Sequence, residues 1–87
     1  MTEIYSHTEE RPGNDAWITD SITIFRDEDG LSLRHKHTAK GSWFDPVRQV
    51  NEQLLSDDFN KAQEQVDLYL KENSLEDKFS IILLNLI

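Results

Sequence analysis

This chain of 87 residues contains no cysteine, three glycines, two prolines and no long hydrophobic run. The absence of cysteine excludes disulfide bonds and thiolate metal sites, so one small core has to stabilise the fold. The longest apolar stretch, within 79–87, is far shorter than the roughly 20 residues that span a bilayer. The first residues lack the basic and apolar regions of a secretory signal. We therefore expect a cytoplasmic protein without membrane attachment.

The chain is strongly acidic: it has 17 acidic and nine basic residues, which give a net charge of −8. Such a field repels phosphate groups, so we do not expect direct nucleic-acid binding, whereas a basic protein partner would be attracted. The sequence also lacks a glycine-rich phosphate loop, a Gly-x-Ser-x-Gly motif and a His-Glu-x-x-His motif. We therefore predict a non-enzymatic protein without a cofactor.

The clearest structural pattern predicts a β-hairpin over about 16–26 and 31–40. Apolar and polar residues alternate in both segments, which is typical of strands with one buried face. The Asp-Gly pair between them is a strong hairpin signal. A two-residue turn would place Ile24 opposite His35, and a four-residue loop would place it opposite Leu33. A three-residue loop would mix the two faces and is excluded.

The segments on either side of the hairpin complete the predicted α+β fold. Residues 1–15 hold few large apolar side chains, which predicts a flexible N-terminal arm before a single α+β domain over 16–87. The nearly all-apolar segment over about 78–87 predicts a C-terminal strand, with a short helix as the alternative.

Between these segments, apolar residues at helical spacing predict one kinked helix or two consecutive helices over about 46–72. An Asp-Pro pair at 45–46 would begin the first helix. The phase of the apolar pattern changes near Ser56, and the polar residues 56–58 would cap a second helix. The Asn-Ser pair at 73–74 would end it.

His35 and His37 are the sharpest candidates for chemistry. Alternate residues of a strand share a face, so the two imidazoles would lie about 7 Å apart. A third metal ligand could come from His7 or Asp20. Two-histidine spacing alone fixes neither ligand number nor geometry, so we predict no metal site and keep a metal-responsive domain as a hypothesis.

The candidate partner-binding residues are charged or aromatic. They are Arg34 and Lys36 on the outer face of the hairpin, Trp43 after it, and Glu52, Asp57, Asp58, Glu64 and Asp67 in the acidic segment. The basic pair would otherwise discourage edge pairing of an exposed strand.

These residues support two hypotheses about partners. The first is a protein-binding module, of which a homodimer is one form, because the hairpin and the C-terminal run offer more apolar surface than one or two helices cover. The alternative is an inhibitor whose acidic residues imitate nucleic-acid phosphates in the cleft of a basic enzyme or nucleoprotein complex.

Overall fold

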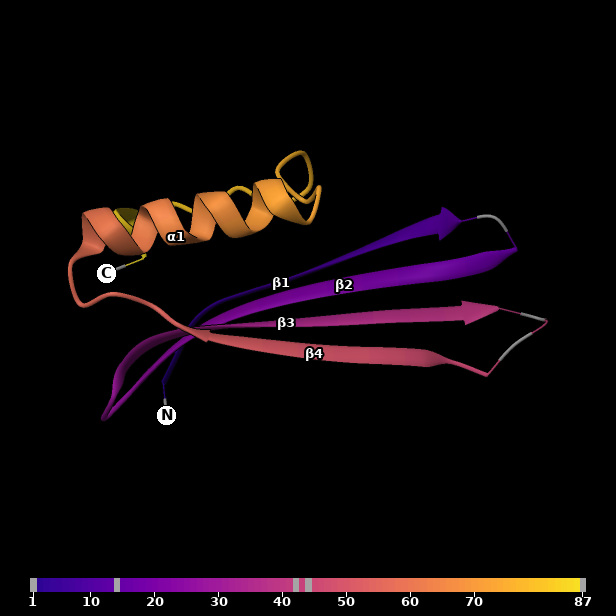
Figure 1. Ribbon diagram of the computed structural model, residues 1–87, viewed down its shortest axis with the longest axis horizontal. Helices are drawn as coiled ribbons and strands as arrows, with labels where there is room; N and C mark the ends of the chain where they lie inside the picture. Colours follow the sequence, from indigo (N-terminus) through magenta and orange to yellow (C-terminus); the bar gives the residue numbers. More distant parts are fainter. Residues whose placement is uncertain (1, 14, 42, 44, 87) are drawn as a thin grey trace.

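The computed structural model describes residues 2–13, 15–41, 43 and 45–86. Four strands form one antiparallel sheet in sequence order: β1 (Thr2–Gly13), β2 (Ala16–Asp27), β3 (Gly30–Gly41) and β4 (Val47–Leu54). One helix, α1 (Phe59–Glu72), and a C-terminal segment with a 3₁₀ turn, η1 (Leu83–Asn85), follow the sheet. Both pack on the same side of the sheet, which we call the covered face, and the opposite side is the open face (Figure 1). The predicted α+β class is therefore confirmed.

The hairpin formed by β2 and β3 confirms the prediction from alternating residues. Ile24 lies opposite Leu33, which is the register predicted for the four-residue loop. The backbone amide of Asp29 donates to the Asp27 carboxylate over 2.8 Å and holds the turn. Gly30 has a φ of 116°, a conformation that side chains with a Cβ rarely adopt.

Residues 2–13 form β1, where a flexible arm was expected. This strand pairs with β2 along its length, with a register shift between Glu3 and Tyr5. Hydrogen bonds along the edge of β2 and the packing of Ile4 and Tyr5 against the core offset the entropy lost on ordering. The apolar pattern is weak because several of its side chains on the covered face, including His7 and Arg11, are polar.

Residues 47–54 form β4, so the helix predicted from residue 46 is wrong here. Val47, Val50 and Leu54 do not make a buried stripe, and all three are exposed. The edge of β3 offers backbone hydrogen-bond partners along this segment. That pairing overrides a weak helical pattern.

The second predicted helix is confirmed as α1, after a break at the expected position. Its N-cap is Asp58, whose carboxylate accepts from the Asn60 amide over 2.9 Å. Its C-cap is Asn73, as the polar pair at 73–74 indicated. The apolar stripe of the helix buries Ala62, Val66 and Leu70 against the sheet.

The C-terminal run is not the predicted strand, and of the short helix given as the alternative only the 3₁₀ turn η1 forms; the rest of the run is irregular up to residue 86. Phe79, Ile81 and Leu83 are nevertheless buried in the core. Gln63 of α1 holds this segment, since its amide nitrogen donates to the Ile81 carbonyl and its amide oxygen accepts from the Leu83 amide, both over 2.8 Å. One side-chain amide thus bonds to two backbone groups of this irregular segment.

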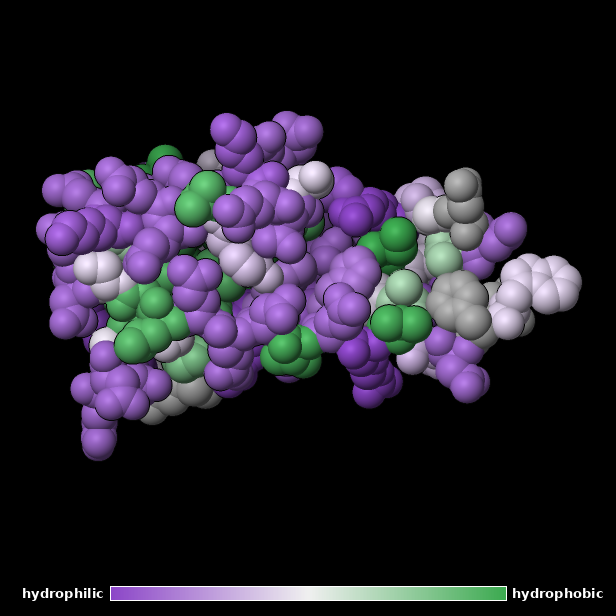
Figure 2. Space-filling model, in the orientation of Figure 1, coloured by the Kyte–Doolittle hydropathy of each residue, from purple (hydrophilic) through white to green (hydrophobic). Residues whose placement is uncertain are grey.

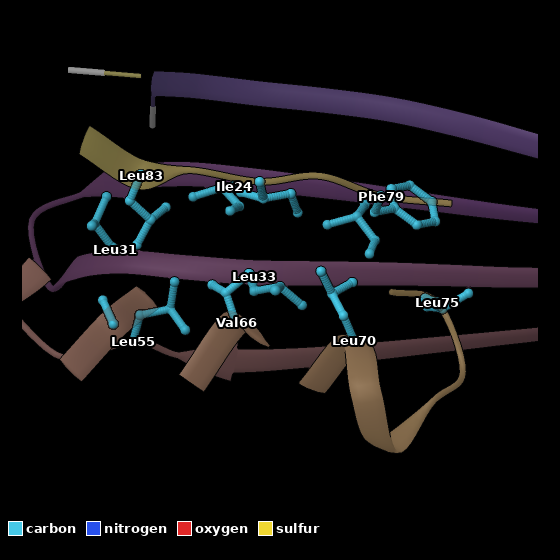
Figure 3. Packing of buried hydrophobic residues seen from close by; sticks show 12 residues of the cluster. Ile24, Leu31, Leu33, Leu55, Val66, Leu70, Leu75, Phe79 and Leu83 are labelled. Carbon is cyan, nitrogen blue, oxygen red and sulfur yellow. The ribbon is translucent and has the colours of Figure 1, made fainter. Parts of the chain in front are cut away.

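The hydrophobic core occupies one part of the covered face (Figure 3). Its members come from the sheet, the helix and the C-terminal segment: Ile22, Ile24, Leu31, Leu33, Leu55, Ala62, Val66, Leu70, Leu75, Phe79, Ile81 and Leu83. The apolar surplus predicted for the hairpin and the C-terminal run is therefore largely buried within the chain. The ends of β1 and β3 and the starts of β2 and β4 extend beyond α1, in a molecule of 44 × 25 × 18 Å (Figure 1). Within the described ranges, no helix has the length and apolar character needed to cross a membrane.

Candidate functional site

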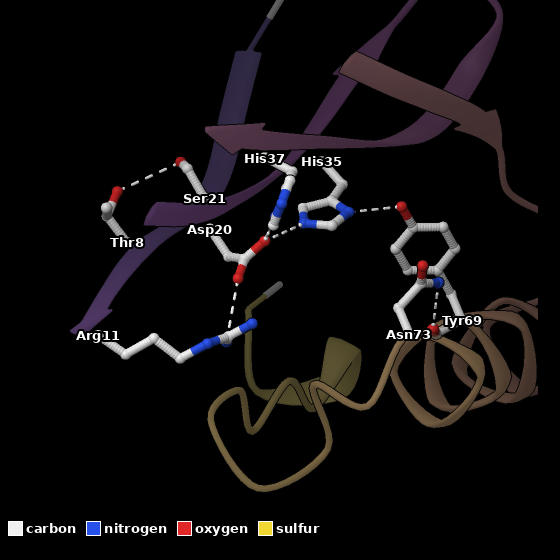
Figure 4. Close-up of polar contacts among 8 residues, drawn as sticks. All are labelled: Thr8, Arg11, Asp20, Ser21, His35, His37, Tyr69 and Asn73. Carbon is white, nitrogen blue, oxygen red and sulfur yellow. Dashed lines mark hydrogen bonds and ion pairs between the residues drawn. The ribbon is translucent and has the colours of Figure 1, made fainter. Parts of the chain in front are cut away.

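Three side chains meet on the covered face beside the core (Figure 4). Asp20 of β2 lies opposite His37 of β3, and His35 lies one step nearer the core on the same face. The Oδ1 atom of Asp20 accepts from His35 Nε2 over 2.9 Å and from His37 Nδ1 over 2.7 Å. One ligand atom from each residue lies within 4.8 Å of the other two. We call these three residues the Asp-His-His cluster.

Of the two predicted third ligands, the structure brings Asp20 to the histidines and leaves His7 outside the cluster. His7 lies on β1 opposite Ile22, and its ring packs edge-on against Phe79 with centroids 5.5 Å apart. Its Nε2 contacts the carboxylate of Glu9. His7 therefore serves as an internal comparison for the two clustered histidines.

Asp20 is the most buried member of the cluster, with 1% of its surface exposed. Burial alone raises the pKa of this carboxyl, but hydrogen bonds from His37 and His35 and the nearby charges of His37 and Arg11 outweigh it. The pKa of Asp20 therefore lies below its ordinary value. Arg11 supplies a permanent positive charge, since its Nη1 lies 3.1 Å from Asp20 Oδ2. The carboxylate is thus ionised at neutral pH.

Tyr69 links the cluster to α1, because its hydroxyl lies 2.7 Å from His35 Nδ1. When Nε2 of His35 carries the proton that Asp20 accepts, Nδ1 accepts from the phenol. Burial, the largest cause, raises the pKa of Tyr69; the Asn51 side chain lowers it by less, and the charge of Asp20 adds a smaller increase. The phenol therefore stays protonated at neutral pH and acts as a hydrogen-bond donor rather than as an activated nucleophile.

The cluster borders a hollow of about 180 Å³. Its lining is mostly polar and consists of Arg11, Asp20, His35, His37, Gln49, Asn51, Asn73 and Leu75. A space of this kind admits water or a small ion to the cluster.

The predicted basic residues lie on the open face, away from the cluster. Arg34 donates from Nε to Glu52 Oε1 over 2.6 Å, and its guanidinium lies 5.0 Å from the ring centre of Phe25. Lys36 is exposed and lies opposite Val50. Because β3 is an interior strand, its basic residues cannot serve to protect a sheet edge, as the sequence alone had suggested.

The other predicted partner-binding residues are spread over the molecule. Trp43, in the connection from β3 to β4, is 84% exposed. Asp57 and Asp58 are exposed just before α1, at the other end of the sheet (Figure 1). Glu64 and Asp67 are exposed on α1. The structure therefore does not gather these residues into one site.

The surface has no single large apolar patch in the view of Figure 2, where hydrophobic side chains form separate groups between hydrophilic ones. Exposed apolar side chains include three in β4, namely Val47, Val50 and Leu54. The edge of β4 is thus the stretch of sheet on which exposed apolar groups and strand geometry coincide.

Sequence reasoning missed Arg11 and Tyr69 as partners of the cluster. Arg11 falls in the segment expected to be an arm, and Tyr69 belongs to the apolar stripe of α1. Alternation along β1 would have placed Arg11 on the same face as Asp20 had the strand been recognised. No known protein family, curated protein or solved structure matches this chain, so its function has to be inferred from its own residues.

Proposed function

We propose that this protein is an interaction module that forms a two-fold dimer through the outer edge of β4. The observation that carries the proposal is the self-complementary order Arg48, Val50, Glu52 along this edge. Pairing of two copies would join two four-stranded sheets into one continuous sheet.

The two edges of the sheet differ in their protection against pairing. The β1 edge contains a register shift between Glu3 and Tyr5. It also contains Pro12, which has no backbone N–H to donate to another strand. Along β4 the register with β3 runs without a break from Val47 to Leu54, with no proline or glycine. The β4 edge is therefore the one suited to accept another strand.

The hydrogen-bond phase of β4 decides which of its backbone groups face outward. The Leu55 amide donates to the Leu31 carbonyl over 2.8 Å, which makes these two residues a hydrogen-bonded pair. Such pairs alternate along an antiparallel ladder, so the odd-numbered residues of β4 bond to β3. Arg48, Val50 and Glu52 therefore direct their backbone N–H and C=O groups away from β3.

The side chains of these residues select one register. If Val50 pairs with Val50 of a second copy, each Arg48 lies opposite a Glu52 of the other copy, and all these side chains lie on the open face. A shift by two residues places Val50 opposite Glu52 or Arg48 instead. Opposite charges in directly opposed positions contribute about 0.2–1 kcal/mol each.

Burial of the Val50 side chain would add to the stability of the dimer. Val50 is 58% exposed in the single chain and would lie on the two-fold axis, where its neighbour is another valine. Glu52 keeps its bond to Arg34 and has a second oxygen for Arg48 of the other copy.

The mass of the protein in solution at high micromolar concentration tests the proposal, measured by sedimentation equilibrium. We expect a dimer for the natural sequence and a monomer for Arg48→Glu and for Glu52→Arg, because each variant places like charges opposite each other. An equimolar mixture of the two variants should restore the dimer, since both cross-pairs then have opposite charges. Leu68→Lys, at an exposed position on α1, is the control and should dimerise normally.

A monomeric natural sequence at the highest attainable concentration would overturn the proposal, and so would a mixture that stays monomeric although both variants are folded by circular dichroism. Because Glu52 also bonds to Arg34, Val50→Lys provides a second variant that leaves this pair intact. It should also be monomeric, because it places two ammonium groups at the axis.

A further inference from the structure

We infer that the Asp-His-His cluster binds a divalent transition-metal ion of the Zn²⁺ and Co²⁺ class. This site lies on the covered face and involves none of the open-face side chains of the proposed dimer edge. Zn²⁺ and Co²⁺ bind well to two imidazole nitrogens and one carboxylate. Mg²⁺ and Ca²⁺ favour oxygen ligands alone, so this donor set selects against them.

The geometry of the cluster is close to that of a three-ligand site. The Asp20 oxygen lies 2.9 Å from His35 Nε2 and 2.7 Å from His37 Nδ1, and the three ligand atoms fall within 4.8 Å of one another. Metal bonds of about 2.0–2.2 Å need donors slightly farther apart than hydrogen bonds hold them. A small rotation of the His37 ring, which is partly exposed, supplies that space.

A second observation points to a ligand at this place. The Oδ2 atom of Asp20 is buried and, among the described residues, accepts no hydrogen bond, although Arg11 lies 3.1 Å away as an ion pair. Buried carboxylate oxygens in folded proteins are nearly always hydrogen-bonded. The carboxylate borders the hollow of about 180 Å³, which has room for an ion and the water molecules that complete its coordination.

Tyr69 supplies the support that metal-binding histidines usually have. A metal ion takes the lone pair of His35 Nε2, so the ring proton moves to Nδ1 and is donated to the Tyr69 oxygen, 2.7 Å away. The same contact therefore holds the ring with and without the ion, and the direction of the hydrogen bond reverses on binding.

Arg11 sets the affinity of the site. Its positive charge beside Asp20 opposes a bound cation, and its side chain has to turn away when the ion enters. Arg11 lies on an edge strand and its side chain is about one third exposed, so the guanidinium can move into solvent when it turns away from Asp20. Removing this charge should strengthen metal binding, an effect opposite to that of removing a ligand.

The experiment uses untagged, chelator-treated full-length protein, titrated with Zn²⁺ by calorimetry and with Co²⁺ by visible absorption. We expect one ion per chain and a Co²⁺ band typical of nitrogen and oxygen ligands. His37→Gln should weaken binding at least about tenfold. Arg11→Gln should tighten it several-fold, and His7→Gln should leave it unchanged.

His7→Gln is the matched control because it removes the third histidine of the chain while the cluster stays complete. The inference is overturned if neither ion binds saturably, if His37→Gln binds as tightly as the natural sequence, or if the loss follows His7 instead. His35→Gln repeats the test from the other histidine, with folding checked by circular dichroism. The monomeric variant Arg48→Glu should bind the ion normally, which separates this inference from the proposed dimer.

Discussion

The covered face of the sheet has two halves that are built on opposite physical principles. Under α1, Ile22, Ile24 and Leu33 are fully or almost fully excluded from solvent and pack against apolar side chains. On the same two strands, Asp20 and His37 lie nearer the strand ends that extend beyond α1, and they contact polar groups. Side chains of β2 and β3 keep alternating between the two faces along both halves. The halves therefore differ in the side chains that contact these strands on the covered face.

This comparison shows how a small domain accommodates a buried carboxylate. Burial of an isolated charge is strongly unfavourable unless hydrogen bonds and opposite charges compensate it. Asp20 receives two hydrogen bonds from histidines and one ion pair from Arg11. The polar half is thus stabilised by hydrogen bonds and an ion pair, and the apolar half by close packing and the burial of apolar surface.

The largest effect is expected in the apolar half. Leu33→Ala should lower the free energy of unfolding by about 2–5 kcal/mol, because Leu33 is 1% exposed and the surrounding core cannot fill the cavity. Urea denaturation monitored by circular dichroism measures it. Leu68→Ala, at an exposed position of α1, should change stability by no more than about 0.5 kcal/mol. Equal losses in both variants would mean that Leu33 is not in a close-packed core.

In the polar half, Asp20→Asn should destabilise the fold by about 1.5–3 kcal/mol, since charged hydrogen bonds to His35, His37 and the Arg11 pair are weakened at once. The same urea experiment, with chelator present, measures the change. Glu64→Gln on the exposed face of α1 is the control and should be neutral. A neutral Asp20→Asn would show that these contacts add nothing to stability.

Acidification should remove the contribution of Asp20 and leave the apolar half intact. Since the pKa of Asp20 is lowered in the folded state, its stabilisation is complete above the unfolded pKa of about 3.9 and is lost as pH falls through the folded value. The stability difference between the natural sequence and Asp20→Asn should therefore shrink in acid. A difference that stays constant to low pH would contradict the assigned direction of the shift.

The smallest effect is expected for the link between the polar half and α1. Tyr69→Phe removes the hydroxyl that contacts His35 and should reduce stability by about 0.5–1.5 kcal/mol. Tyr5→Phe is the control, because Tyr5 also packs against the core, whereas other residues line the hollow beside the cluster. Equal effects of Tyr69→Phe and Tyr5→Phe would show that the contact between the Tyr69 hydroxyl and His35 adds nothing specific to stability.

The sequence predicted well the elements whose pattern reflects their own burial. In the β2–β3 hairpin the apolar residues alternate with polar ones, and in α1 they recur every three to four residues. Both patterns match the element that forms, so the side chains reveal the structure. In β4 all three large apolar residues are exposed, and their spacing was helical by coincidence. The existence of β4 depends on the edge of β3, which no local pattern reports.

The candidate site was predictable in part for the same reason. His35 and His37 follow from alternation within one strand, and Asp20 from the register of one hairpin. Arg11 and Tyr69 come from elements whose position relative to the hairpin is set by the whole fold. Their roles required the structure.

The two hydrogen bonds made by Gln63 have a consequence for the order of folding during synthesis. The sheet connects neighbours in sequence, so its strands can pair as they leave the ribosome. The core around Ile22 and Leu33, however, stays incomplete after α1 has been translated, until the segment through Leu83 has followed and has reached Gln63. A nascent chain that stalls before that point lacks part of the cover of its apolar strands, and should be a preferred substrate for chaperones.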